Sequence, residues 1–329
     1  MKQRILVTGS EGFIGSHLTT ELIKRGYKVR ALCLYNSFND IGWLKDLAPT
    51  ILKEIEIVRG DIKDYDCVKS AMKDIDVVFN LAALIAIPYS YNAPESYIDT
   101  NIKGTMNILR AAIDNQLEQV IHTSTSEVYG TAQFVPITEN HPLVGQSPYS
   151  ASKIAADQLA YSYYCSFGLP VSVVRPFNTY GPRQSLRAVI PTIISQVISG
   201  NNELKLGNVD ATRDFNFVQD TVNGMISFIG NAGAFGEFIN LGTGVEVTIK
   251  DVVKTISQLT NVDLQIKMDE QRIRPDKSEV ERLCACNKKA KNILGWSPEH
   301  NLEQGLGITL KWFENHIDNG FIFSDRYIV

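Results

Sequence analysis

Residues 7–18 read VTGSEGFIGSHL and place three glycines, Gly9, Gly12 and Gly15, between an apolar run and a segment of helical periodicity. Glycine permits a tight turn from strand into helix, and it lets backbone N–H groups approach a pyrophosphate at the helix N-terminus. Three glycines are a weak signal by themselves, but a strand before them and a helix after them are the context that the pattern requires. The stretch therefore predicts the dinucleotide site of a Rossmann-type fold.

Outward from this turn, apolar runs of strand length alternate with segments of helical composition. The runs are nearly continuous in Val, Ile and Leu, which is typical of parallel strands covered by helices on both faces. We therefore expect an α/β fold with a doubly wound parallel sheet. Its strands are predicted at 4–8, 28–34, 54–58, 76–83, 119–124 and 170–178.

After about residue 177 the order of elements becomes irregular. Predicted helices at 189–200 and 249–259 alternate with shorter predicted strands at 235–242 and 263–268. This pattern indicates a smaller C-terminal substrate lobe that is interleaved with the end of the first lobe. The predicted Rossmann lobe comprises 1–176 plus about 214–241, and the predicted substrate lobe comprises 177–213 plus 242–329.

Composition excludes several classes of protein. The chain has 329 residues, is 44% hydrophobic and carries a formal net charge of −4, so it can bury a sizeable core and does not fit a general nucleic-acid binder. It contains no run of 18 apolar residues and enters a strand at once, so we expect no membrane partner, no signal peptide and a cytoplasmic location. Cys284 and Cys286 have no second pair at metal-ligand spacing, so we expect reduced thiols and no metal.

The end of the second strand bears on the choice of dinucleotide. A carboxylate there would bind the ribose hydroxyl of NAD, but the expected position, about Cys33, has no acid. Asn36 and Ser37 could instead bond a 2′-phosphate, although the only nearby arginine, Arg30, lies inside the strand. The sequence therefore predicts NAD or NADP, with NADP slightly favoured.

Two further segments carry reactive side chains. PYSASK places Tyr149 and Lys153 four residues apart, on one face of a predicted helix. A neighbouring ammonium favours the phenolate, so we expect a lowered pKa that makes Tyr149 a usable base. HTSTSEVYG, residues 122–130, puts Thr125, Ser126 and Glu127 where the fifth strand ends. Hydroxyls and a carboxylate at that place predict a catalytic site.

Taken together, these motifs resemble the extended short-chain dehydrogenase/reductase family over nearly the whole chain. Other matching segments are GDI (60–62), NLAA (80–83), NIKGT (101–105), RPFNTYGPRQ (175–184) and RDFNFVQD (213–220). The resemblance implies a cofactor site formed by Gly9, Gly12, Phe13, Ile14, Gly15, Asp61, Ile62, Leu81, Ala82, Ala83, Tyr149, Lys153 and Pro176.

A closer resemblance is to the bacterial nucleotide-activated N-acetylglucosamine 4,6-dehydratases of legionaminic and pseudaminic acid synthesis. It is carried by LYNSFNDIGWL (34–44), AALIAIPYSY (82–91), RQSLRAVIPTI (183–193) and QRIRPDKSEVERL (271–283). It implies a UDP- or GDP-linked sugar as substrate, with UDP-N-acetylglucosamine preferred. The implied binding residues are Ile85, Ile87, Asn178, Arg183, Val189, Arg213 and Arg274.

The resemblance also implies a mechanism. Tyr149 takes the C4 hydroxyl proton as hydride passes to a tightly held NAD(P), Thr125 orients that hydroxyl, and Glu127 removes the C5 hydrogen as the C6 hydroxyl leaves. The resulting 5,6-ene either receives the hydride back at C6, giving a 4-keto-6-deoxy sugar, or is released after re-reduction at C4. Ser126 stands where related enzymes carry an aspartic acid, which leaves the general acid open. The apolar run Leu84–Ala86 suits an acetamido methyl group better than a hydroxyl.

Three alternatives remain. A UDP-glucuronate decarboxylase would need a cation for the C6 carboxylate, and residues 84–87 offer none. A nucleotide-sugar 4-epimerase would not need Glu127. A cofactor-binding sensor without catalysis should have lost Tyr149 or Lys153, and both are present. The family resemblance further implies a homodimer or higher homo-oligomer, built on the helices around 100–113 and 154–164.

Overall fold

The computed structural model describes residues 2–273 and 275–316. At its centre lies a seven-stranded sheet in the order β11-β6-β5-β4-β1-β2-β3, with every pairing parallel. The predicted Rossmann-type doubly wound α/β fold is confirmed. The strands are β1 (Arg4–Thr8), β2 (Lys28–Leu34), β3 (Ile55–Gly60), β4 (Val77–Asn80), β5 (Gln119–Thr123), β6 (Val171–Pro176) and β11 (Phe238–Leu241).

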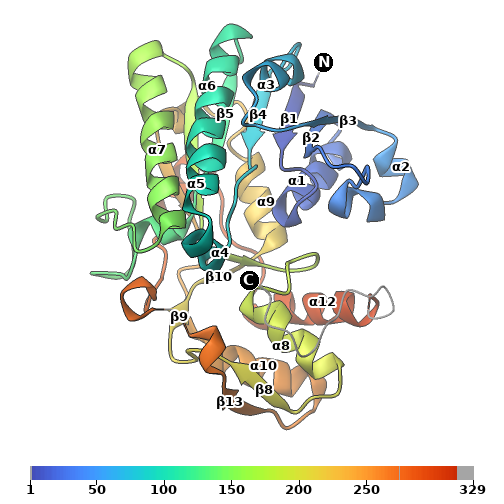
Figure 1. The fold of residues 1–329 in the computed structure, drawn as a ribbon, viewed down its shortest axis with the longest axis vertical. Helices are drawn as coiled ribbons and strands as arrows, with labels where there is room; N and C mark the ends of the chain where they lie inside the picture. The colour runs from blue at the N-terminus through green and yellow to red at the C-terminus, as the bar shows by residue number, and fades with distance from the viewer. Residues whose placement is uncertain (1, 274, 317–329) are drawn as a thin grey trace.

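Helices cover both faces of this sheet (Figure 1). Because successive strand residues point to opposite faces, Ile5 and Val7 join the core beside α1 and α9, whereas Leu6 joins the core on the other face. Apolar side chains therefore pack against helices on both faces of the sheet, as expected for strands that are apolar along nearly their whole length. The covering helices are α1 (Phe13–Lys24) and α9 (Val218–Ile226) on one face, and α3 (Tyr65–Ala71), α6 (Gly104–Asp114) and α7 (Pro148–Phe167) on the other.

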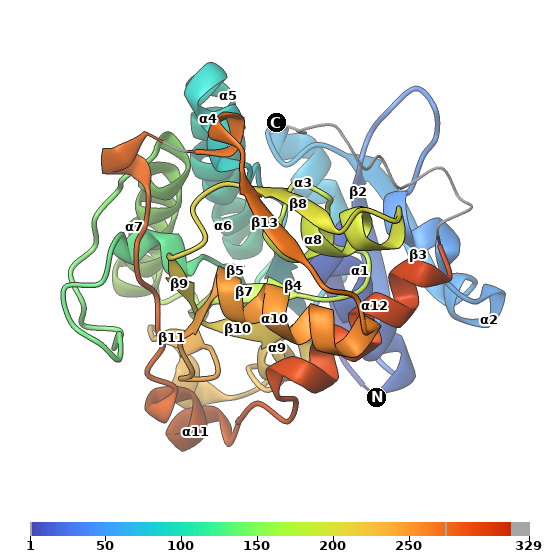
Figure 2. The same cartoon turned by 90° about the horizontal axis from the view of Figure 1, so that it is seen from below.

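A smaller lobe lies beyond the carboxyl ends of the strands, below the sheet in Figure 1 and towards the viewer in Figure 2. The apolar core on the α1 side of the sheet continues into it through Ile190, Ile193 and Leu306, so the two lobes share one core. Its helices are α8 (Val189–Ile198), α10 (Ile249–Thr260) and α12 (Leu302–Glu314). Its paired strands are β8 (Glu203–Leu206) with β13 (Gln265–Met268), and β9 (Thr212–Arg213) with β12 (Val247–Thr248).

Short elements connect these parts. β7 (Asn178–Tyr180) pairs with β10 (Phe215–Phe217) where the two lobes meet. A π-helical turn, η2 (Ile98–Lys103), leads directly into α6. The others are η1 (Gly42–Asp46), α2 (Pro49–Leu52), α4 (Ile87–Asn92), α5 (Pro94–Tyr97), η3 (Ser126–Tyr129), η4 (Ala232–Ala234), η5 (Glu270–Arg272), η6 (Asp276–Ser278) and α11 (Lys288–Leu294).

Two of the predicted strands show where β4 ends and how the central sheet is completed. The strand predicted at 76–83 ends at Asn80, because the N–H groups of Leu81 and Ala82 donate to the Thr8 hydroxyl instead of continuing the ladder. The strand predicted at 235–242 is β11, which returns to the main sheet and pairs with β6. The chain therefore completes its central sheet only after building part of the smaller lobe.

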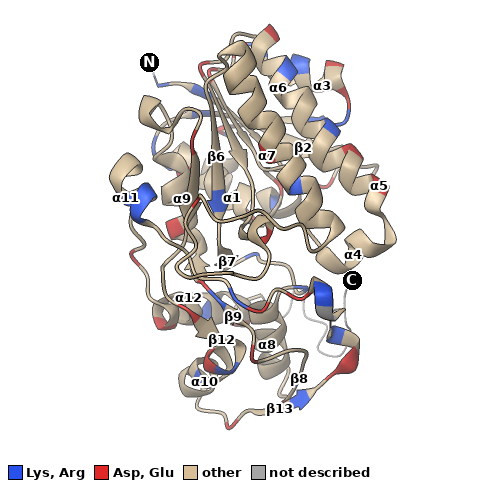
Figure 3. Cartoon of the chain, turned by 90° about the vertical axis from the view of Figure 1, so that its left-hand side faces the viewer, with Lys and Arg blue, Asp and Glu red and all other residues tan. Residues whose placement is uncertain are grey.

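Figure 3 shows basic and acidic positions interspersed along the chain, with both signs on the same helices. Of the helices described, none has both the length and the apolar content needed to cross a bilayer. Within 2–273 and 275–316, no three His, Cys, Asp or Glu side chains gather closely enough to hold a metal ion.

Candidate functional site

The glycine turn brings β1, α1 and the end of β4 into close contact. Gly9 has φ +66°, and a Cβ there would lie 2.9 Å from the Ala82 backbone. A Cβ on Gly15 would lie 2.1 Å from the Gly9 carbonyl oxygen. Gly12, the N-cap residue of α1, supplies no side-chain cap. The turn therefore leaves open the space and the backbone donors that a pyrophosphate requires, and its residues fit the predicted dinucleotide.

A cavity of about 870 Å³ extends from this turn along the carboxyl ends of the strands to the smaller lobe. The described residues that line this cavity do not include Asn36, Ser37 or Arg183. Arg274 lies outside the described residues. The structure brings most of the predicted site residues together there: Gly9, Gly12, Phe13, Ile14, Gly15, Asp61, Ile62, Leu81, Ala82, Ala83, Ile85, Ile87, Thr125, Ser126, Glu127, Tyr149, Lys153, Pro176, Asn178, Val189 and Arg213.

Helix α7 presents Tyr149 and Lys153 to this cavity. Ser147 caps it by accepting a hydrogen bond from the Ser150 N–H, and Pro148 occupies the first helical turn, where a missing N–H costs nothing. Both reactive side chains lie in the first two turns and are buried. The Lys153 ammonium donates to the Thr123 carbonyl oxygen at 2.7 Å, which ties α7 to the end of β5.

The protonation of this pair differs from the sequence expectation. Burial raises the pKa of Tyr149, and the nearby Glu127 carboxylate raises it further, although a hydrogen bond with Thr125 opposes both. Burial also lowers the pKa of Lys153 to about 8, so it stays mostly protonated at neutral pH. The prediction of a lowered pKa for Tyr149 is wrong here, because desolvation dominates and the ammonium donates to Thr123 rather than to the phenol.

Thr125, Ser126 and Glu127 occupy the turn that follows β5. The Thr125 hydroxyl accepts a hydrogen bond from the Glu127 N–H at 3.2 Å and so caps the short helix η3. Thr125 and Ser126 are buried, whereas Glu127 is half-buried, and all three line the cavity. A carboxylate, a hydroxyl and a phenol therefore meet on one wall of the cavity.

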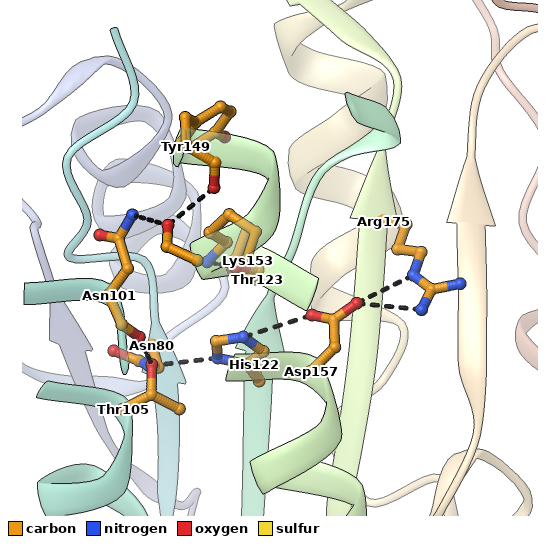
Figure 4. Close-up of polar contacts among 10 residues, drawn as sticks. Asn80, Asn101, Thr105, His122, Thr123, Tyr149, Lys153, Asp157 and Arg175 are labelled. Carbon is orange, nitrogen blue, oxygen red and sulfur yellow. Dashed lines mark hydrogen bonds and ion pairs between the residues drawn. The ribbon is translucent and has the colours of Figure 1, made fainter. Parts of the chain in front are cut away.

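The apolar segment after β4 is held rigidly against this wall. The Asn101 side chain accepts from the Leu84 N–H and donates to the Leu84 carbonyl oxygen, both at 2.9 Å, and it also donates to the Ser152 hydroxyl on α7 (Figure 4). Leu84 and Ile87 pack with Tyr97 and Tyr149. Sequence reasoning missed Asn101, whose signal was its place in the NIKGT motif.

Within that segment the side chains have different environments. Ile87 is buried, whereas Ile85 is 62% exposed and lines the cavity. The predicted apolar wall thus divides into a packed part, which supports Tyr149, and an open part at Ile85, which a ligand can contact.

A buried polar chain runs behind the reactive residues (Figure 4). Asn80 contacts the His122 ring at 3.2 Å, His122 contacts Asp157 at 3.6 Å, and Asp157 accepts two hydrogen bonds from the Arg175 guanidinium at 3.0 and 3.1 Å. Burial raises the pKa of Asp157, but hydrogen bonds and Arg175 outweigh it and hold the pKa below its usual value. Asp157 lies one turn after Lys153, and its negative charge opposes the lowering of the Lys153 pKa.

The arginines are arranged differently from the prediction. Arg213 lines the cavity, where its guanidinium pairs with Glu279 at 3.0 Å. Arg183, at φ +67°, turns away and donates to the Ser16 hydroxyl at 3.3 Å. Arg187 and Arg272 line the cavity instead, and sequence reasoning missed both. Both could have been predicted, because they lie in the segments 183–193 and 271–283 that carried the closer resemblance.

Glu11 is a further residue that sequence reasoning missed. It belongs to the glycine turn and lines the cavity beside Leu34. Its carboxylate accepts a hydrogen bond from the Leu34 N–H at 2.8 Å. The sequence shows an acidic residue in the glycine turn, but it does not show that this side chain contacts the end of β2.

Comparisons with known proteins show which family the chain resembles. UDP-N-acetyl-alpha-D-glucosaminuronate decarboxylase of Bacillus cytotoxicus is 33% identical over 95% of this chain and 98% of its own. A solved structure of UDP-N-acetylglucosamine 4-epimerase from Methanobrevibacter ruminantium M1, with UDP-N-acetylmuramic acid, is 30% identical over 96% of this chain and 100% of its own, with a TM-score of 0.87.

A second similar structure is that of TunA, described as an NAD-dependent NDP-hexosamine 5,6-dehydratase involved in tunicamycin biosynthesis. It is 26% identical over 95% of this chain and 98% of its own, with a TM-score of 0.83. Residues 6–309 match the profile of a family described as GDP-mannose 4,6 dehydratase. The chain therefore belongs to the GDP-mannose 4,6 dehydratase family, among the extended short-chain dehydrogenase/reductases that act on nucleotide sugars.

Proposed function

We propose that the protein is a nucleotide-sugar 4,6-dehydratase that acts on UDP-N-acetylglucosamine in bacterial nonulosonic acid or surface-glycan synthesis. The observation that supports it best is the Glu127 carboxylate, which lines the cavity together with Thr125 and Tyr149. Elimination across C5 and C6 needs a base for the C5 hydrogen in addition to the group that deprotonates the C4 hydroxyl. Glu127 and Tyr149 supply two such groups on one wall.

The cofactor in this proposal is a tightly held nicotinamide dinucleotide. Gly9, Gly12 and Gly15 would hold its pyrophosphate, Leu81–Ala83 would flank its path, and Lys153 would bind the ribose beside Tyr149. When bound, the oxidised nicotinamide ring supplies a hydride acceptor and a positive charge. TunA, described as NAD-dependent, is a structural precedent for such a cofactor on this fold.

In this proposal, each catalytic residue of the chain has a separate role. Thr125 orients the C4 hydroxyl. Tyr149 accepts its proton, because the positive charge of a bound oxidised nicotinamide would favour the phenolate that burial alone disfavours. Glu127 removes the C5 hydrogen, which the 4-ketone has made acidic, as the C6 hydroxyl leaves. Ser126 is buried beside them and has no carboxyl group to protonate the leaving hydroxyl, so it serves at most as a relay. The hydride taken from C4 returns either to C6, which gives the 4-keto-6-deoxy sugar, or to C4, which gives the 5,6-ene. The relative described as a hexosamine 5,6-dehydratase is a precedent for the second product.

The direct test is mass spectrometry of the protein incubated with UDP-N-acetylglucosamine. We expect a product lighter by one water. Epimerisation without loss of water would favour the alternative represented by the epimerase relative, and release of CO₂ from a UDP-linked uronic acid would favour the decarboxylase.

The sugar preference gives a second prediction. UDP-N-acetylglucosamine should be consumed about 10–200-fold faster than UDP-glucose, because an apolar wall that receives one methyl group discriminates by about that much. Ile85→Asn should reduce the ratio, whereas Ile308→Asn, at an exposed isoleucine on α12, should not. Equal rates of the wild type on both sugars, measured by product chromatography, would contradict a contact between this wall and the 2-substituent.

Tight cofactor binding gives a third prediction. Because the cofactor is regenerated in each cycle, protein purified without added nucleotide should release about one dinucleotide per chain on denaturation, measured by chromatography. Protein that is empty and turns over only with excess free dinucleotide would contradict tight binding.

Assembly and location complete the proposal. Ile113 on α6 and Tyr161, Tyr164 and Phe167 on α7 are exposed apolar side chains on the two helices that the family resemblance assigns to a dimer. We expect a homodimer or higher homo-oligomer in the cytoplasm, to be checked by light scattering and cell fractionation.

A further inference from the structure

The end of β2 contains a carboxylate that comes from a different element. Glu11 lies in the turn between β1 and α1, yet its Oε1 accepts a hydrogen bond from the N–H of Leu34, the last residue of β2. The sequence placed no acid near Cys33 and Leu34, and for that reason it favoured NADP. In the folded protein, an acid occupies this position through space rather than along the strand.

The second oxygen of this carboxylate, Oε2, has no partner within the described protein. Oε2 of Glu11 is buried and has no hydrogen-bond partner among the described residues. Glu11 also lines the cavity, next to Gly9, Gly12 and Leu34. A buried, unpaired carboxylate oxygen is costly, and a hydroxyl donor arriving from the cavity would satisfy it.

The loop after β2 fixes Glu11 in this position. The Trp43 N–H donates to the Glu11 carbonyl oxygen at 3.0 Å. Gly42, at φ +52°, packs so closely that a Cβ would lie 2.5 Å from that oxygen and 3.0 Å from the Glu11 Cβ. The carboxylate is therefore held from both its backbone and its side chain.

The groups that could bind a 2′-phosphate at this place are already engaged. Arg59 lies on β3, opposite Cys33 of β2. Its guanidinium donates to the carbonyl oxygens of Asn39 and Asp40 and to the Asn39 side chain. The Asn36 amide donates to Leu34 and Asp40 and accepts from the Asp40 N–H. Lys63, which lines the cavity nearby, pairs with Asp61 at 3.2 Å.

We propose that Glu11 is the residue that selects NAD over NADP, with its Oε2 accepting a hydrogen bond from the 2′-hydroxyl of the adenosine ribose. In dinucleotide-binding folds this hydroxyl is bound by an acid near the end of the second strand. A 2′-phosphate would instead bring negative charge against a buried carboxylate. The inference rests on the proposed dinucleotide site. It replaces the slight preference for NADP that was predicted from the sequence with a preference for NAD.

Nucleotide binding without any sugar tests this directly. Nucleotide-stripped protein is titrated with NAD and with NADP, and binding is followed by calorimetry or by intrinsic tryptophan fluorescence, to which Trp43 beside Glu11 contributes. We expect the wild type to bind NAD at least about tenfold more tightly than NADP, the difference that a hydrogen bond to a charged group provides. Because no sugar is present, this result is independent of the dehydratase assignment.

The matched variants are Glu11→Gln and Glu21→Gln. Glu11→Gln keeps an oxygen for the Leu34 N–H but removes the charge, so the ratio of the two dissociation constants should fall about tenfold, mainly through tighter binding of NADP. Glu21, on α1 and paired with Arg25, lies outside the cavity lining, so its variant should leave the ratio unchanged. Equal affinities in the wild type, or an unchanged ratio in a folded Glu11→Gln protein, would overturn the proposal.

Discussion

Replacing Tyr149 by Phe is expected to lower the rate of sugar oxidation by ~10²–10⁴-fold, the usual contribution of a positioned general base. The ring packs against Tyr97 and Ile87, so Phe should keep the apolar cluster that supports the wall. What is lost is the hydroxyl and its hydrogen bond with Thr125. The measurement is the nicotinamide absorbance in the first turnover after mixing with UDP-N-acetylglucosamine.

The control for this variant is Tyr91→Phe. The Tyr91 hydroxyl contacts the Ser278 hydroxyl at 2.6 Å, and Tyr91 is not among the residues that line the cavity. Its loss should leave oxidation near the wild-type rate. The content of bound dinucleotide should be the same in all three proteins. Rapid oxidation in a folded Tyr149→Phe protein would remove Tyr149 from the mechanism.

Glu127→Gln should separate the two halves of the reaction. Gln keeps the size and much of the hydrogen bonding of Glu127 but cannot accept the C5 proton. Oxidation at C4 should therefore persist, whereas loss of water and exchange of the C5 hydrogen with solvent deuterium should fall by ~10²–10⁴-fold. Mass spectrometry in deuterium oxide measures both.

A milder change at the neighbouring position sharpens the test. Ser126→Ala removes a buried hydroxyl and should reduce the rate without abolishing it, as expected for a relay. If Glu127→Gln dehydrates the sugar at nearly the wild-type rate, Glu127 is a structural carboxylate and another group removes the C5 hydrogen.

Much of the fold was predictable because its signals are local. The strands at 4–8 and 28–34 coincide with β1 and β2, since continuous apolar runs bounded by turns need both faces buried. The spacing of Tyr149 and Lys153 placed them on one face of α7 for an equally local reason, the helical period. The fold class follows from such signals, whereas most of the cavity residues were implied by the family resemblance.

What could not be predicted depends on packing between distant segments. Glu11 reaches the end of β2 because Gly42 and Trp43 hold it there, and no pattern in the glycine turn encodes that contact. Arg183 turns from the cavity to α1 through its left-handed backbone, while Arg187 lines the cavity. The raised pKa of Tyr149 reflects burial, which spacing alone does not measure.

The late return of β11 has a consequence for synthesis on the ribosome. β6 is complete about 60 residues before β11 emerges, which is several seconds at ~5–20 residues per second. During that interval the outer edge of β6 has no neighbouring strand, and an unpaired apolar edge is a template for pairing with another nascent chain. Arg175 places a charge within this strand, and inward-pointing charges are one means by which edge strands resist such pairing. We therefore expect Arg175, which binds Asp157 in the folded protein, to oppose such pairing until β11 completes the central sheet.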